Sequence, residues 1–529
     1  MSQQSVELWK SDILRWRGFG IAAYESILLS SVSFLTILIG VISWTLPIWD
    51  AAHILINPWI WCLFLLELVL LTGTLIAQLH LLKLQEPQQP HWLRSGLKLP
   101  KWFVRPVANV LQHSRTLGRL IDLSLYYAAS TIAGAATVYY FTLLLGSKGA
   151  GGSWLYGLVL GGLHALVVIA GGRNTLVFPI IHQQRVFAFK KELPKAVPVA
   201  AVLPLIAVAV TAVLRFTLMS GHVSQWALRD LMVSLVAGCF TVFCFYMGTS
   251  LLGIVMTEHL HFALPGDSDP NGKLYAILQN DKDPVWQSLA LQDLSFLSQQ
   301  GPSEHWRRAA IFSDVSGNAW KVPVQFCLTE VESLAKKVAA VLPQTGAQPG
   351  EARPESHAAP KWNVHPTSTK PLGTVGHAQE EAAWYIRSKC WRTLQCIRVL
   401  ASLSIASQSE DRLGTAQLSQ PNIGAVTATL GSTVLALQAY AKTCMAAAPR
   451  GSALTQQSMG PDAPGRKGSR NAGAPGFALH DAALAALYGI LGAFGSEVIP
   501  VVKSSKTQLP FGTTADVVAL LNRCSTYSE

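Results

Sequence analysis

The sequence predicts an all-α fold, a polytopic membrane protein with six transmembrane helices followed by a soluble α-helical C-terminal region with flexible linkers. Half of the 529 residues are hydrophobic and only 13% are charged, which is too apolar for an average soluble protein. The run 231–256 holds no charged residue, and as a helix it would more than cross a hydrocarbon core of about 30 Å. Beyond it, helical patterns alternate with stretches rich in Pro and Gly.

The predicted spans are the long apolar runs in the first half of the chain. They are residues 27–46, 59–82, 123–145, 154–170, 197–219 and 231–256. The first run is too long for a signal peptide and has no cleavage site after it, so we interpret it as a retained anchor. In the fourth, Gly157 and Gly161 have the GxxxG spacing that lets membrane helices pack closely. This spacing is a weak indication of a packing face.

Basic residues predict the orientation of these spans. They collect in the N-terminal segment 1–26 and in the loops 83–122 and 172–195, whereas the alternate loops hold only Lys148 and Arg229. Positive residues near the ends of spans stay on the cytosolic side. Both termini are therefore expected on the cytosolic side, and the net charge of +11 is attributed to topology and anionic lipid. Sequence-specific binding of nucleic acid is not expected.

Three ionisable residues inside the spans, Glu67, His164 and Arg215, raise the question of transport. Each also has a structural explanation, because Arg215 is close enough to a span end to snorkel and a neutral His164 needs one hydrogen bond. We find no inverted repeat and no run of charges that would line a conduction path. A six-span transporter or channel with a cytosolic regulatory domain stays open as the alternative function.

The chain divides into membrane, helical and linker segments. The predicted segments are a cytosolic N-terminus 1–26, a six-helix transmembrane domain 27–256, a membrane-proximal helical region 257–342, a flexible linker 343–377, a helical region 378–448, a second flexible linker 449–476 and a C-terminal helical region 477–529. Helical patterns within the soluble part cover 285–299, 320–342, 379–407, 422–447, 477–503 and 514–524. The loop 83–122 mixes aromatic and basic residues, so it either lies on the membrane surface or only sets topology.

The helix predicted over 379–407 has two contrasting faces. Its apolar stripe consists of Ile386, Cys390, Leu394, Ile397 and Ala401. On roughly the opposite face lie Trp384, Arg387, Trp391 and Arg398. This second face suits a partner or a membrane surface, but it also suits the core and solvated positions of a helical bundle.

Motifs that carry catalysis are missing from the sequence. There is no GxxxxGK[ST] nucleotide loop, no HExxH, no GxSxG and no kinase signature. The eight cysteines have no CxxC pair and no metal-ligand spacing with histidine, and we interpret them as reduced thiols. No enzyme activity, cofactor, metal or small-molecule substrate is expected.

Three stretches resemble a known family. They are FPIIHQQRVFAFKK at 178–191, LALQDLSFLSQ at 289–299 and SEDRLG at 409–414. Together, and in this order after six spans, they resemble the nuclear division cycle (Ndc) family of transmembrane nucleoporins. The resemblance implies a structural nucleoporin at the nuclear envelope that anchors the nuclear pore complex scaffold in the pore membrane and assists pore assembly. It also implies partners among other nucleoporins, of the inner-ring scaffold and WD-repeat types, and among membrane lipids.

Two of these stretches supply candidate structural or partner-binding residues. Phe178, Pro179, Ile180 and Ile181 are expected to form a loop that packs against the spans or the soluble half. Leu289, Leu291, Asp293, Leu294 and Phe296 are expected to form a structural helix. Trp384, Arg387, Trp391 and Arg398 complete the set of candidates for partner contact.

Overall fold

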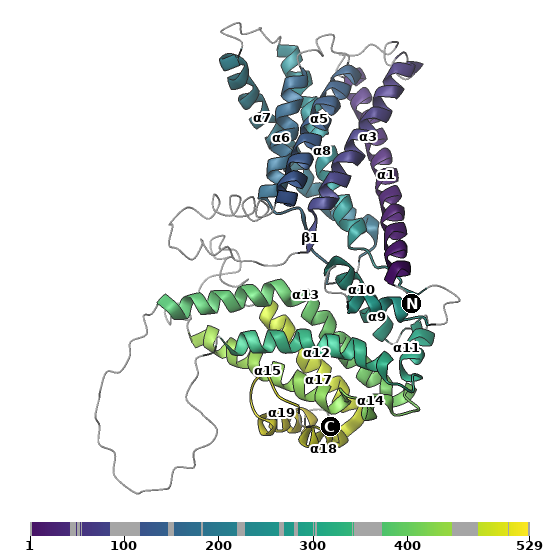
Figure 1. The fold of residues 1–529 in the computed structure, drawn as a ribbon. Helices are drawn as coiled ribbons and strands as arrows, with labels where there is room; N and C mark the ends of the chain where they lie inside the picture. The colour runs from purple at the N-terminus through teal and green to yellow at the C-terminus, as the bar shows by residue number, and fades with distance from the viewer. Residues whose placement is uncertain are drawn as a thin grey trace, which may run out of the picture. The chain divides into compact units, whose positions relative to one another are not determined.

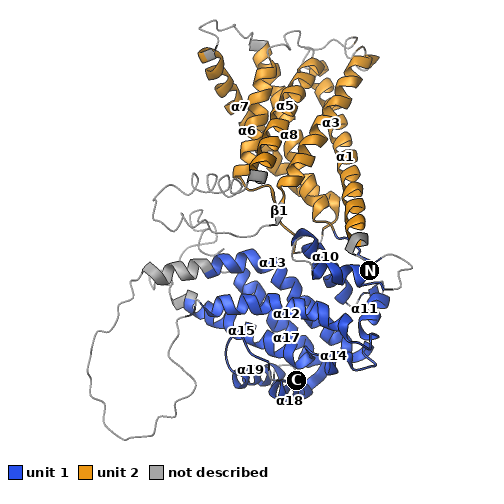
Figure 2. Cartoon of the chain, viewed as in Figure 1, with its two compact units in different colours: residues 1, 259–529 blue, residues 2–258 orange. Residues whose placement is uncertain are grey.

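The fold, taken from a computed structural model, consists almost entirely of α-helices (Figure 1). The structure describes residues 3–42, 49, 53, 56–84, 117–145, 153–180, 183–218, 228–263, 269–279, 284–299, 301, 304–340, 342, 373–446, 474–505 and 507–526. Contacts divide the chain into two compact units, residues 2–258 and residues 259–529 (Figure 2). The predicted all-α fold class is confirmed.

In the described residues of the unit 2–258, six long helices run lengthwise beside one another (Figure 1). They are α1 (Gln3–Ile42), α3 (Pro58–Leu81), α5 (Leu117–Leu144), α6 (Ser153–Ala170), α7 (Arg185–Leu218) and α8 (Leu228–Met256). Each contains most of one predicted apolar run. Helices α1 and α7 begin well before their predicted runs. Because α1 begins at Gln3, most of the predicted N-terminal segment 1–26 is helical. In the described residues of this unit, β1 (Lys83–Leu84) and β2 (Thr175–Leu176) form one parallel pair.

The outward faces of these helices are apolar. Phe34, Leu65, Ile132 and Val202 are each more than half exposed in the isolated chain. Exposing this many large apolar side chains to water would be unfavourable, but such side chains are the expected surface of a helical bundle surrounded by lipid. The exposed faces therefore support the interpretation of this unit as a membrane domain.

Among the described residues, seven helices are long and apolar enough to cross a membrane, judged by length and composition. They are Val6–Ile42, Pro58–Leu81, Ser153–Ala170, Arg185–Thr217, Asp230–Met256, Ile423–Thr443 and Pro475–Ser504. The predicted third run, 123–145, forms α5 but is not in this set, and α5 contains several Ser, Thr and Tyr residues. The last two of these seven helices lie in the unit 259–529. In Ile423–Thr443, 83% of the most apolar 18-residue stretch is buried, as expected for the central helix of a bundle.

Glycines bring the backbones of α5 and α6 into direct contact. A Cβ atom added to Gly161 would lie 2.1 Å from the carbonyl oxygen of Ser130, and one added to Gly157 would lie 2.6 Å from the Cα of Ala135. Gly134 of α5 approaches the same two glycines from the other side. The GxxxG spacing therefore marks a packing face, at which only glycine leaves room for the neighbouring backbone.

The unit 259–529 is a bundle of helices of unequal length. They are α9 (Gly272–Leu278), α10 (Pro284–Ser298), α11 (His305–Phe312), α12 (Asn318–Ala339), α13 (Gly373–Glu410), α14 (Thr415–Leu418), α15 (Ile423–Ala446), α17 (Ala474–Phe494), the 3₁₀ turn η6 (Gly495–Glu497), α18 (Val498–Ser504) and α19 (Thr514–Thr526). Each helical pattern predicted for the soluble region is found as helix, but the pattern 477–503 is interrupted by η6, where Gly495 has a positive φ, and forms α17 and α18 instead of one helix. The short helices α9, α11 and α14 were not predicted, because four to eight residues are too few to show a helical period.

The predicted linkers fall mostly outside the described residues. Helix α13 begins at Gly373, so the last residues assigned to the first linker, 343–377, are helical. Helix α17 begins at Ala474, inside the second, 449–476. Most of the loop 83–122, with its proposed membrane-surface segment, also lies outside the described residues.

Candidate functional site

The LALQDL stretch forms α10, which is buried along almost its whole length. Leu289, Leu291 and Leu294 have at most 1% of their surface exposed. Residues of α9, α11 and α13 contact the helix. Helix α10 therefore lies inside the unit 259–529, and its leucines are placed to hold that unit together.

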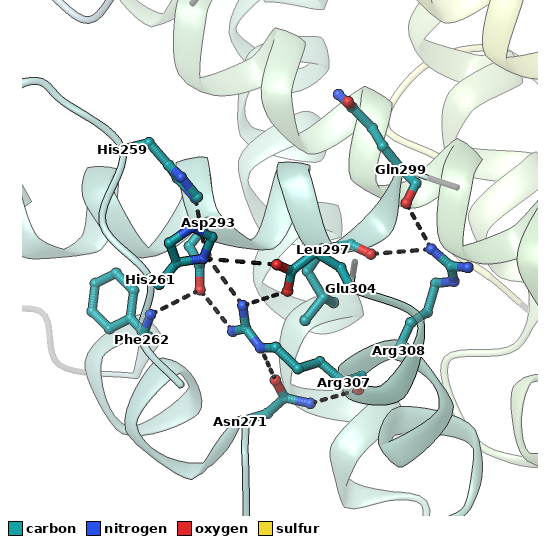
Figure 3. Close-up of polar contacts among 10 residues, drawn as sticks. All are labelled: His259, His261, Phe262, Asn271, Asp293, Leu297, Gln299, Glu304, Arg307 and Arg308. Carbon is teal, nitrogen blue, oxygen red and sulfur yellow. Dashed lines mark hydrogen bonds and ion pairs between the residues drawn. The ribbon is translucent and has the colours of Figure 1, made fainter. Parts of the chain in front are cut away.

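Asp293 is the polar centre of this region and is itself fully buried (Figure 3). Its Oδ2 atom accepts hydrogen bonds from Nη2 of Arg307 at 2.7 Å and from the backbone N–H of Phe262 at 3.3 Å. Its Oδ1 atom lies 3.0 Å from Nε2 of His259. Burial alone would raise the pKa of this carboxyl group, but the hydrogen bonds from His259 and Arg307 and the Arg307 charge bring the pKa below its ordinary value.

Arg307 donates hydrogen bonds to three side chains. Besides Asp293 of α10, it reaches Glu304 at 3.0 Å and the side-chain oxygen of Asn271 at 3.3 Å. Nδ2 of Asn271 in turn donates to the backbone carbonyl of Arg307 at 2.9 Å. Burial would lower the pKa of Arg307, but the contacts with the two carboxylates raise it overall. The network joins the segment 259–262 to α9, α10 and α11.

Asp293 was singled out from the sequence, whereas His259, Asn271 and Arg307 were not. The available signal was the pair Arg307-Arg308 in a short amphipathic segment, together with His259-x-His261 just after the last span. Neither pattern predicts which residue the arginines or the histidines contact. Only the fold brings a histidine and an arginine 14 or more residues away onto one carboxylate.

The same residues include a possible metal-ligand set. Ligand atoms of His259, His261 and Asp293 lie within 4.8 Å of one another, and Nδ1 of His261 is 3.8 Å from Oε1 of Glu304. However, the Arg307 guanidinium contacts both oxygens of Asp293, and its positive charge opposes a second cation there. The donor set is therefore better explained as an ion-pair network than as a metal centre.

The SEDRLG stretch closes the same region from the far end of α13. Both oxygens of Glu410 accept hydrogen bonds from Arg308, at 2.6 to 3.1 Å, and the arginine side chain is only 3% exposed. Asp411 accepts from the backbone N–H groups of Thr415 and Ala416, which caps α14. Gly414 has φ +66°, a conformation that favours glycine. Two of the three family-like stretches therefore supply carboxylates to adjacent arginines of α11.

The FPII stretch lies in the unit 2–258 and follows β2. Phe178 is buried, Pro179 is exposed, and Ile180 is 48% exposed. Ile181 lies outside the described residues. One side chain of the motif therefore packs into the unit while its neighbours face outward.

Helix α13 buries the stripe that the sequence pattern marked. Ile386, Cys390, Leu394, Ile397 and Ala401 are all buried. On the other face, Arg387 is exposed, whereas Trp384, Trp391 and Arg398 are half-buried. That face is less open than its sequence pattern indicated, and its binding role stays a prediction.

Two of the three ionisable residues of the spans, Glu67 and His164, are enclosed by protein, whereas Arg215 is only partly buried. Glu67 accepts a hydrogen bond from Thr137, and the ring of His164 lies 5.0 Å from that of Phe245. A cavity of about 10 Å³ lies between Glu25, Gln78 and His164. It has room for about one water molecule. Nothing of this size provides a path for a solute.

The helices of the unit 2–258 and the compact helical unit 259–529 are consistent with an all-α polytopic membrane protein. Residues 152–388 match the family model described as nucleoporin protein Ndc1-Nup. The match contains the FPII and LALQDL stretches and confirms the resemblance to Ndc-type transmembrane nucleoporins. It points to the nuclear pore and nuclear envelope and supports a nucleoporin role. No curated protein matches the chain significantly.

Proposed function

We propose that this protein is a structural transmembrane nucleoporin, which anchors the nuclear pore complex scaffold in the pore membrane and assists pore assembly. The observation that carries the proposal is that the family match runs across the boundary at residues 258 and 259. The matched region therefore includes both spans and soluble helices, as an anchor that connects membrane to scaffold requires. Both termini would face the cytosolic or pore side, as the basic loops predict.

Partner contacts would be made by exposed side chains of the soluble unit. Val315 is 90% exposed, Leu418 is 81% exposed and Leu413 is 52% exposed. These residues flank Gly317 and Gly414, and the side chains of Ser419 and Thr415 lie against Gly317, so the two turns are neighbours. Isolated apolar side chains are common on surfaces, but neighbouring turns that both expose them are typical of a protein contact. The expected partners are nucleoporins of the inner-ring scaffold and WD-repeat types.

The test is to tag the full chain, locate it in cells and identify the proteins that co-purify in mild detergent. We expect a punctate nuclear rim and inner-ring nucleoporins. A reticular or plasma-membrane pattern without nucleoporins would contradict the proposal.

The same experiment tests the partner surface. Leu418→Asp should leave abundance and rim localisation unchanged, because the side chain is exposed, and should reduce the co-purified nucleoporins about tenfold if Leu418 is a central contact. Phe477→Asp, which changes an exposed apolar residue of α17, is the matched control. Equal retention of partners by both variants would exclude this surface while leaving the anchor proposal intact.

A further inference from the structure

A groove of about 840 Å³ lies in the unit 2–258, where α6 and α8 end and α7 begins. Its lining combines polar and apolar groups. Leu176, Val177 and Ile254 form apolar parts of its wall. The volume lies in the range of about 300–1,000 Å³ that is typical of small-molecule pockets.

The charges that line the groove are predominantly positive. Arg185 is paired with Glu258 at 2.5 Å, and Lys195 is paired with Glu192 at 2.5 Å. Arg173 and Lys191 also line the groove, and within the described part of the chain no carboxylate pairs with either. The excess positive charge of the groove is therefore carried by Arg173 and Lys191.

Arg173 is also held in position. Its guanidinium carbon lies 3.9 Å from the centroid of the Tyr246 ring, and this ring is itself buried in the bundle. Stacking on an aromatic ring fixes the plane of a guanidinium group and leaves its edge donors available for a planar or tetrahedral anion. A phosphate group fits these donors.

We propose that this groove binds the headgroup of an anionic phospholipid. Arg173 and Lys191 would contact the phosphate and the second negative group, and the apolar wall would take the first carbons of an acyl chain. Basic pockets between the ends of membrane helices are typical sites for anionic lipid headgroups. The position at the ends of α6 and α8 favours a lipid over a soluble phosphate, because the apolar part of a lipid would already lie beside these helices.

The first test compares two adjacent lysines of α7. The purified full chain in detergent would be titrated with short-chain phosphatidylserine or phosphatidylcholine, and bound lipid would be counted by native mass spectrometry. Lys191→Gln should weaken phosphatidylserine binding about fivefold, the effect of one basic residue near a membrane surface. Lys190→Gln changes an exposed neighbour that does not line the groove, and it should leave binding within about twofold of the wild type.

The second test fills the groove without removing a charge. Gly253 of α8 lines the groove, and a Cβ atom added there meets nothing within 4 Å. Gly253→Leu should therefore fold normally and abolish phosphatidylserine binding. Gly73 of α3 is equally open but does not line the groove, so Gly73→Leu is the matched control and should bind as the wild type does.

Three results would overturn the proposal. One is equal binding of phosphatidylserine and phosphatidylcholine by the wild type. Another is equal loss from Lys190→Gln and Lys191→Gln, which would indicate general attraction to a basic surface. The third is displacement of the lipid by inorganic phosphate at similar concentration, which would indicate a soluble phosphate site. None of these results affects the proposed role as an anchor.

Discussion

Asp293 shows how one buried side chain can organise the junction between four segments. Asp293→Asn keeps the size of the side chain but removes its charge, and it leaves the buried guanidinium of Arg307 without one of its two carboxylates. Removing one partner of a buried ion pair destabilises proteins by about 3–5 kcal/mol. We therefore expect a loss of about this size, measured by thermal or denaturant unfolding of the full chain in detergent with tryptophan fluorescence.

The matched control is Asp481→Asn, which changes an exposed aspartate in α17. It should alter stability by less than about 0.5 kcal/mol. If Asp293→Asn lowered the free energy of unfolding by no more than Asp481→Asn does, the ion-pair network would contribute little to stability. The position of α10 would then depend on leucine packing alone.

The lowered pKa of Asp293 also predicts a pH dependence. The pKa of the Asp293 carboxyl group is lower in the folded protein than the ordinary aspartate pKa of about 3.9. The stability that its ionisation contributes is therefore present above about pH 4. This contribution is lost as the pH falls through the folded-state pKa. His259, His261 and Arg307 contact the Asp293 carboxylate, and Glu304 pairs with His261 and Arg307.

The measurement is the stability difference between the wild type and Asp293→Asn from pH 6 downwards. We expect the difference to be constant at first and to shrink below about pH 4, because both proteins then carry a neutral side chain at this position. A difference that grows with acid would contradict the assigned direction of the shift.

At the scale of elements, the contact between α5 and α6 depends on the absence of side chains. Gly161→Ala would place a methyl group 2.1 Å from the Ser130 carbonyl oxygen, which is backbone and cannot move away without shifting a helix. Overpacking of this kind costs about 1–3 kcal/mol. We expect lower abundance of the full-length protein in membranes and a lower midpoint of thermal unfolding.

The control is Gly73→Ala in α3, where the added methyl group meets nothing within 4 Å. This variant should be as abundant as the wild type, or slightly more so, since alanine favours a helix over glycine. Equal behaviour of the two variants would show that α5 and α6 separate easily and that the GxxxG spacing does not define their contact.

The same scale shows what sequence pattern can and cannot reveal. The stripe from Ile386 to Ala401 was visible because α13 is long enough to repeat its period several times. Helix α11 has eight residues, too few to show a helical period, so the sequence pattern did not indicate that its two arginines are buried. Their partners Asp293 and Glu410 come from other helices, and no local rule names such partners.

At the scale of the whole molecule, the alternative role in transport is tested by Glu67→Gln. Glu67 is buried beside Thr137, and a glutamine oxygen can accept the same hydrogen bond. We expect unchanged nuclear-rim localisation, and we expect vesicles containing either protein to show the same background ion flux. A flux that the wild type supports and Glu67→Gln loses would favour the transporter over the anchor.

The sequence by itself determined the all-α class, the long apolar helices of the first half and the family resemblance, because length, charge and hydrophobic period are local properties of a chain. Tertiary structure alone decided that Asp293 meets Arg307, that Glu410 meets Arg308, and that Gly157 and Gly161 face α5. It also decided that Arg173 and Lys191 line one groove. Such pairings depend on which helix faces pack together, and packing is settled by the whole set of contacts rather than by any single stretch.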